Sequence, residues 1–248
     1  MRAEHALFDG TDVFFYELTD STNNRAKEYA DGPCAAEAFF VAKSQTSGRG
    51  RRGRSFESDE GGIYLSYLLF PDLSAAEAIK LTVFAAVAVA EAIKEVSALE
   101  PKIKWVNDVF LGGKKVAGIL TEGEFSSDGG FRYAVVGIGI NVKRRDFSGE
   151  LREIATDIET ECGKEIDREE LLSVLMRKLL SFDPSLMGEY MRKYRKMSLA
   201  VGKRVLVRRA SEEYFATVLG IAEDGSLEVE LDGGEKRNLI SGEISIRL

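Results

Sequence analysis

One basic loop constrains how this chain can fold. Residues 48–54 read GRGRRGR, so four arginines fall within six positions and each lies next to a glycine. Apolar runs flank the loop at 39–42 and 63–68. The pattern predicts two strands joined by a basic loop whose glycines let backbone amides come close to a ligand.

The loop is a candidate anion site because of what arginine offers. Its guanidinium carries a permanent charge and a planar set of donors that suits phosphate or carboxylate oxygens. A charged run can also be a solvated surface, and an arginine-glycine run can be a nucleic-acid patch. The loop alone leaves these alternatives open.

The overall charge argues against general nucleic-acid binding. The chain has 248 residues, with 34 Lys and Arg against 41 Asp and Glu, and its formal net charge is −7. An acidic chain is a poor general binder of nucleic acid. The arginine loop is therefore a local exception, which indicates a defined site.

Composition also limits which kinds of active site and which cellular compartment are expected. The only histidine is His5, which argues against a Ser-His-Asp triad or a histidine-rich metal site. Cys34 and Cys162 are far apart and do not predict a disulfide framework. Residues 1–20 lack a signal-peptide pattern, and the apolar run at 81–90 is too short to cross a bilayer. We therefore expect a cytoplasmic protein without a membrane segment.

Hydrophobic periodicity and helix caps predict an α/β region followed by an all-β module. The later strands alternate and are separated by Asp-Gly and Ser-Gly turns, which is typical of a small barrel. We place a domain boundary near residue 197, giving domains 1–196 and 197–248. Strands are predicted at 13–18, 39–42, 63–70, 101–111 (a strand that turns and resumes), 114–122, 133–142, 201–209, 214–223, 227–231 and 238–248, and helices at 25–31, 74–96, 148–162, 167–182 and 185–196.

Three small polar residues, Ser21, Thr22 and Asn23, stand between the first strand and the first helix. Such residues favour helix N-caps, and capping alone would explain them. They also form a compact set of donors and acceptors that could bind a polar, neutral group.

Four stretches in one order carry a family resemblance: DSTNN (20–24), SQTSGRGRRGRSF (44–56), KWVNDVFLGGKKVAGIL (104–120) and GIGINV (137–142). With them the chain resembles the biotin protein ligases, that is, the biotin–[acetyl-CoA-carboxylase] ligases and holocarboxylase synthetases. Val106 replaces the proline of the family's KWPND motif, and Phe56 stands near a position that often holds tryptophan. The ending at 240–244 is typical of the family's small barrel.

The resemblance implies a fold and an activity. The fold is α/β, with a mixed central sheet and flanking helices of the class II synthetase-like biotin/lipoate ligase type, plus a C-terminal SH3-like β-barrel. The form is the short one, without an N-terminal DNA-binding domain. The activity is that of a ligase that makes biotinyl-5′-AMP from biotin and ATP with Mg²⁺. The enzyme then transfers biotin to a lysine of a biotin carboxyl carrier protein. A homodimer that binds neither DNA nor membranes is expected.

The resemblance also assigns residues. The expected catalytic residues are Arg49, Arg51 and Lys115, whose charges would offset the repulsion between the biotin carboxylate and the triphosphate. The expected biotin contacts are Ser21, Thr22, Asn23, Gln45, Arg49, Gly50, Arg51, Lys115 and Gly118. The expected ATP contacts are Arg54, Phe56, Lys104, Asn107, Asp108 and Asn141, with Asp108 also a ligand of Mg²⁺.

Two alternative functions follow from the same residues. A lipoate–protein ligase shares the catalytic fold, but lipoate's dithiolane head offers no hydrogen-bonding pattern for Ser21, Thr22 and Asn23 to match. A nucleic-acid-binding protein could use the arginine-glycine loop and a small barrel, with binding that weakens steeply as salt rises.

Overall fold

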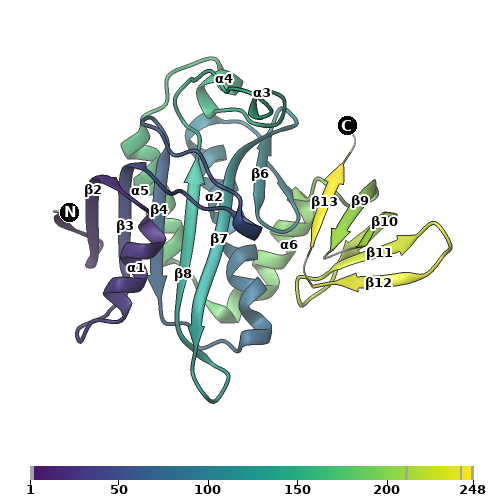
Figure 1. Ribbon diagram of the computed structural model, residues 1–248, viewed down its shortest axis with the longest axis horizontal. Coiled ribbons are helices and arrows are strands. Elements are labelled where there is room, and N and C mark those ends of the chain that lie inside the picture. The colour runs from purple at the N-terminus through teal and green to yellow at the C-terminus, as the bar shows by residue number, and fades with distance from the viewer. Residues whose placement is uncertain (1–2, 210–211, 241, 247–248) are drawn as a thin grey trace.

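The computed structural model describes residues 3–209, 212–240 and 242–246. Its larger sheet has eight strands in the order β1-β2-β3-β4-β8-β7-β6-β5 (Figure 1). β2 and β3 run parallel, whereas β3 and β4 run antiparallel, so the sheet is mixed as predicted. The strands are β1 (Glu4–Phe8), β2 (Thr11–Thr19), β3 (Ala38–Gln45), β4 (Ile63–Leu69), β5 (Lys102–Lys104), β6 (Asp108–Leu111), β7 (Lys114–Phe125) and β8 (Phe131–Ile140).

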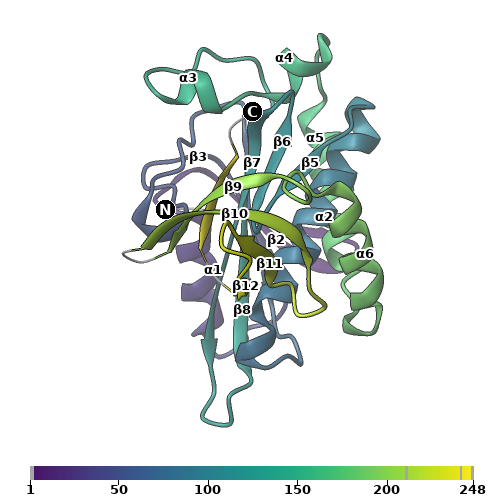
Figure 2. The same cartoon turned by 90° about the vertical axis from the view of Figure 1, so that its right-hand side faces the viewer.

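Helices cover both faces of this sheet (Figures 1 and 2). α1 packs on one face, whereas α2, α5 and α6 gather on the other. α2 is apolar and buried along most of its length because it is enclosed by the sheet and its two neighbouring helices. In the described part of the chain, no helix is long and apolar enough to cross a membrane. The helices are α1 (Thr22–Ala30), α2 (Ala78–Ser97), α3 (Leu151–Ile154), α4 (Ile158–Cys162), α5 (Arg168–Leu180) and α6 (Met187–Met197).

The edge strand β1 was not predicted from the sequence. Its residues are mostly exposed, so they lack the apolar alternation that marks a half-buried strand. The position of β1 is set instead by the tight turn that joins it to β2. Asp9 and Gly10 have φ angles of 47° and 83°, as a two-residue hairpin turn requires.

The smaller sheet is antiparallel, in the order β12-β11-β10-β9-β13. The strand predicted at 238–248 divides in two, with Gly242 between them at a φ of 147°, a conformation suited to glycine. β12 and β13 are opposite edges, so within the described residues the sheet is open rather than closed into a barrel. Ser241, Arg247 and Leu248 of the predicted strand lie outside the described residues. The strands are β9 (Arg204–Arg209), β10 (Glu212–Ile221), β11 (Leu227–Leu231), β12 (Lys236–Leu239) and β13 (Glu243–Ile246).

One apolar core continues from the larger sheet into the smaller one. Trp105 is 3% exposed and packs in this core, and its Nε1 donates to the Gly225 carbonyl at 3.0 Å. The peptide bond between Trp105 and Val106 is cis. Arg195 Nε donates to the Ile221 carbonyl at 2.7 Å. The smaller sheet is thus attached by apolar and polar contacts. A domain boundary at residue 197 stays a prediction.

Candidate functional site

The parallel pairing of β2 and β3 builds one end of a pocket. In their register Thr19 lies opposite Gln45, so both strands end at the same level. α1 begins three residues after β2 ends, which brings Ser21 and Thr22 beside Gln45. Residues far apart in the chain therefore converge at this edge.

Gln45 takes over the capping of α1. Its Oε1 accepts from the backbone N–H of Thr22 at 2.8 Å and from the Thr22 hydroxyl at 3.2 Å. A helix N-terminus leaves backbone N–H groups without intrahelical partners, and a side-chain oxygen can satisfy them. Ser21 occupies the N-cap position, but its side chain makes no cap hydrogen bond. Ser21 is one of the residues that line the pocket.

Two glycines on β8 make room for side chains in this pocket. A Cβ on Gly137 would overlap the amide of Asn23, and a Cβ on Gly139 would lie 2.5 Å from Cε1 of Phe56. The glycines of the GIGINV stretch thus mark a close approach between a strand and the side chains above it.

The β6–β7 hairpin and the arginine loop build the other end. Arg51 Nη1 donates to Asn107 Oδ1 at 3.1 Å, and Lys115 Nζ lies 2.7 Å from Asp108 Oδ1. Burial lowers the pKa of Arg51, partly offset by the charge of Asp108. Burial likewise lowers the pKa of Lys104. These cations are partly removed from water, so an anion placed beside them would be stabilised.

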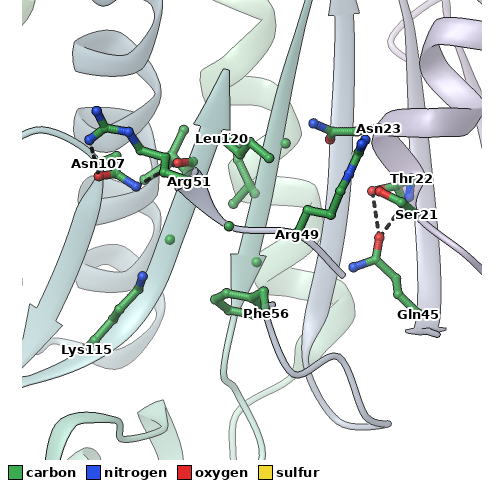
Figure 3. Close-up of a pocket in the computed structure, with 16 residues that line it drawn as sticks. Ser21, Thr22, Asn23, Gln45, Arg49, Arg51, Phe56, Asn107, Lys115 and Leu120 are labelled. Carbon is green, nitrogen blue, oxygen red and sulfur yellow. Dashed lines mark hydrogen bonds between the residues drawn. The ribbon is translucent and has the colours of Figure 1, made fainter. Parts of the chain in front are cut away.

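The pocket as a whole has two chemically different ends (Figure 3). The uncharged residues Ser21, Thr22, Asn23 and Gln45 lie at one end, where Arg49 also lies with its charge paired to Glu122. Arg51 and Lys115 lie at the other end, and Phe56 and Leu120 lie between. All nine residues expected to contact biotin line this pocket, and so do Phe56 and Asn107 of the expected ATP contacts. Phe56 therefore does reach the site, with its ring centroid 5.9 Å from Lys115 Nζ.

The other four expected ATP contacts are not part of this lining. Arg54 pairs with Glu243 at 2.7 Å. Asn141 is buried, and its Nδ2 donates a hydrogen bond to the Thr156 carbonyl at 3.0 Å. Lys104 Nζ lies 5.6 Å from the ring of Phe110. Asp108 pairs with Lys115, and no group of three or more His, Cys, Asp or Glu side chains within residues 3–209, 212–240 and 242–246 could hold a metal. The roles of these four residues stay predictions.

Two family models match this chain in sequence order. The Biotin/lipoate A/B protein ligase family matches residues 15–141, and the Biotin protein ligase C terminal domain matches residues 200–247. The Bifunctional ligase/repressor BirA of Bacillus subtilis is 34% identical over 239 residues, covering 92% of this chain and 72% of that protein. The chain belongs to the biotin protein ligase family.

Other biotin protein ligases agree in sequence and in structure. The Biotin–[acetyl-CoA-carboxylase] ligase of Paracoccus denitrificans is 33% identical over 218 residues, covering 84% of this chain and 90% of that one. The biotin protein ligase of Aquifex aeolicus, solved in complex with biotin and ATP, is similar in fold with a TM-score of 0.78 and 32% identity. That comparison covers 95% of this chain and 98% of the solved one. The mixed α/β fold with an antiparallel C-terminal sheet is thus that of biotin protein ligases.

Sequence reasoning missed Glu122 in this biotin protein ligase. Glu122 lies on β7 and accepts hydrogen bonds from Asn23, Lys27 and Arg49. A signal was available. Side chains alternate along a strand, so Gly118, Leu120 and Glu122 share one face, and Gly118 was already expected at the site.

Proposed function

We propose that this protein is a biotin–protein ligase that makes biotinyl-5′-AMP from biotin and ATP and transfers biotin to a lysine of a biotin carboxyl carrier protein. The observation that carries this function is the polarity of the pocket (Figure 3). It runs from an end of hydroxyl and amide side chains, where Arg49 is paired with Glu122, to a cationic end with Arg51 and Lys115. Biotin has the same order of groups: a neutral cyclic urea, an apolar chain and a carboxylate.

The uncharged end fits the urea. A cyclic urea has one carbonyl acceptor and two N–H donors, which hydroxyl and amide side chains can match. Ser21, Thr22 and Asn23 are each less than 5% exposed, and Gln45 lies beside them. Neutral partners suit a neutral group because a buried charge without a partner is costly.

The cationic end fits the first reaction step. A carboxylate oxygen of biotin attacks the α-phosphorus of ATP, and pyrophosphate leaves. The approaching groups are both negative, so fixed positive charges lower the barrier most where water is excluded. Arg51 and Lys115 line this end, and the ion pair with Asp108 holds Lys115 Nζ in place.

Asp108 is compatible with Mg²⁺ that arrives with ATP. This metal commonly takes one or two protein carboxylates plus substrate phosphates, and Asp108 supplies one carboxylate beside the pocket. Bound there, Mg²⁺ would neutralise phosphate charge.

In the second step the neutral amine of the acceptor lysine attacks the acyl carbon of the adenylate, and AMP leaves.

The two alternative functions fit the site less well. Lipoate would leave the polar end of the pocket without hydrogen-bonding partners. A nucleic-acid patch would leave its arginines without protein partners, whereas Arg49, Arg51 and Arg54 each meet an acceptor on the protein itself.

We further propose a cytoplasmic homodimer that does not bind DNA. Cys34 and Cys162 are both free thiols, which suits a reducing compartment. β1 is an edge of the larger sheet and exposes Leu7, so pairing of two copies could cover this edge. The net charge of −7 disfavours DNA. Light scattering would test whether the protein is a homodimer, and a gel shift would test whether it binds DNA.

The test of the proposed function is biotin-dependent exchange of labelled pyrophosphate into ATP by the purified chain with Mg²⁺. We expect exchange that requires biotin and that lipoate neither supports nor inhibits. Addition of a biotin carboxyl carrier domain should then give a single biotinylated lysine. Absence of both biotin binding and exchange would contradict the function.

A further inference from the structure

Three donors from two separate segments meet at the carboxylate of Glu122. Asn23 Nδ2 donates to Oε2 at 2.7 Å, and Lys27 Nζ donates to Oε1 at 2.6 Å. Arg49 Nη2, from the arginine loop, reaches Oε2 at 3.2 Å and also donates to Asn24 Oδ1 at 2.7 Å. The Glu122 side chain is 25% exposed. Glu122 therefore connects α1 to the start of the arginine loop.

The carboxylate determines which way the Asn23 amide faces. A carboxylate only accepts hydrogen bonds, so the NH₂ group of Asn23 must point toward Glu122. The Asn23 carbonyl oxygen then faces Ser66, whose hydroxyl lies 2.5 Å away. Asn23 lines the pocket, so its amide presents one defined pattern of donor and acceptor to a ligand.

The hydrogen bonds in the other half of this end run the opposite way, from Thr22 toward Gln45 and Ser58. Ser66 Oγ lies 2.7 Å from Thr22 Oγ1, and the Thr22 hydroxyl donates to Gln45. Gln45 Nε2 donates to Ser58 Oγ at 2.9 Å. Ser58 then donates to a backbone carbonyl, which only accepts. An acceptor thus closes each end of the network. Glu122 fixes the orientation of the Asn23 amide, and the backbone carbonyl fixes that of Gln45 through Ser58.

Glu122 must be ionised for this role. Burial raises its pKa, but the hydrogen bonds from Asn23 and Lys27 and the charges of Lys27 and Arg49 outweigh burial, so the net shift is downward. The carboxylate therefore stays charged through neutral and mildly acidic pH.

We propose that Glu122 is a positioning residue that fixes the donor and acceptor pattern of the pocket end that recognises the urea of biotin. The role rests on the proposed function, because it presumes a urea at that end. Glu122 acts through Asn23 and Arg49 rather than by contact with the substrate.

Calorimetric titration with biotin and with 2-iminobiotin would test this role. In 2-iminobiotin a cyclic guanidine replaces the urea, and at neutral pH it is protonated and only donates hydrogen bonds. Glu122→Gln keeps the size of the side chain, but its amide can donate as well as accept, so Asn23 can turn over. We expect biotin binding to weaken roughly ten- to a hundredfold, because a hydrogen bond to a charged group is lost. The biotin KM should rise while kcat changes little.

Selectivity separates positioning from a general structural loss. Glu122→Gln should weaken biotin more than 2-iminobiotin, whereas a distorted pocket would lose both ligands equally. The matched control is Glu124→Gln, two residues along the same strand, where Glu124 pairs with Arg132 at 2.8 Å. The control should behave as the unmodified protein.

The outcomes are distinct. If the unmodified protein does not bind biotin, the proposed function fails. If it binds biotin and Glu122→Gln binds equally well or loses both ligands in proportion, the positioning role is wrong. Should Glu122→Gln fail to fold, Lys27→Gln keeps the carboxylate but raises its pKa. As the pH is lowered, the variant should begin to lose biotin binding at a higher pH than the unmodified protein does. Identical pH profiles of the two proteins would overturn the role.

Discussion

Gly139 lies directly beneath the ring of Phe56, and its missing side chain decides where that ring can sit. In Gly139→Ala the new Cβ would lie 2.5 Å from Cε1 of Phe56, so the ring must move. We expect a loss of about 1–3 kcal/mol in the free energy of unfolding, which is usual for overpacking. Biotin-dependent pyrophosphate exchange should also fall because Phe56 lines the pocket. Urea unfolding and the exchange assay measure the two effects.

Gly188→Ala is the matched control for Gly139→Ala. A Cβ there meets no atom within 4 Å, and the residue lies in α6. Gly188→Ala should stabilise the protein by about 0.4–1 kcal/mol because the unfolded chain loses freedom, and exchange should be unchanged. Equal effects of the two substitutions would show that crowding of the pocket is not the cause.

For single residues, the sequence predicted which residues line the pocket better than it predicted the hydrogen bonds between them. The motif positions Ser21, Arg51 and Lys115 do come together at one pocket. The capping of α1 by Gln45 and the contact of Asn23 with Glu122 were not predicted. Both depend on partners that are far apart along the chain, and short-range patterns carry no information about such pairs.

At the scale of elements, prediction succeeded where burial sets the pattern. The long helix α2 and the strands β3, β4 and β8 are buried, and their apolar runs had indicated them. It failed for β1, which is exposed and held by a turn. The helix predicted at 148–162 is two short helices, α3 and α4, because an extended segment with Ala155 and the N-cap Asp157 interrupts it.

The capping box formed by Ser74 and Glu77 before α2 gives a pH-dependent test. Glu77 accepts from Lys80 and from the backbone and hydroxyl of Ser74, and these bonds lower its pKa from 4.5 to about 2. A lowered pKa means that the stabilisation is full above about pH 4.5 and is lost as the pH falls toward about 2. The carboxylate is 38% exposed, so screening limits the contribution to about 1 kcal/mol.

Urea unfolding of the unmodified protein and Glu77→Gln would measure this contribution. The two proteins should differ at about pH 7 and should become alike at about pH 2. The same difference at both values would mean that the carboxylate's charge does not stabilise the helix start.

For the whole molecule, the continuous core predicts a single unfolding transition. Trp105 is buried where the two sheets meet, and Arg195 of α6 bonds to β10. Loss of the smaller sheet would expose this part of the core, so the two regions should unfold together. Scanning calorimetry should give equal calorimetric and van't Hoff enthalpies. Two resolved transitions would show instead that residues 1–196 and 197–248 are independent.

The arginine loop is also joined to the smaller sheet, which suggests how that sheet serves the reaction. Arg54 Nη2 pairs with Glu243 on β13 at 2.7 Å, and Arg52 lies 3.5 Å from the carbonyl of Arg208 on β9. Arg54 is 69% exposed, so this pair contributes little to stability, in the range of about 0–1 kcal/mol. Its larger effect should be on the position of the loop and therefore on the KM for ATP.

A charge exchange would test that connection. Arg54→Glu and Glu243→Arg should each raise the KM for ATP in pyrophosphate exchange, because like charges would then face each other across the contact. The double substitution restores an opposite pair and should recover most of the loss. If Arg54 instead binds a phosphate directly, the double variant stays as poor as Arg54→Glu alone, because a carboxylate in the loop still repels ATP. Recovery would therefore assign the smaller sheet the role of holding the loop in place.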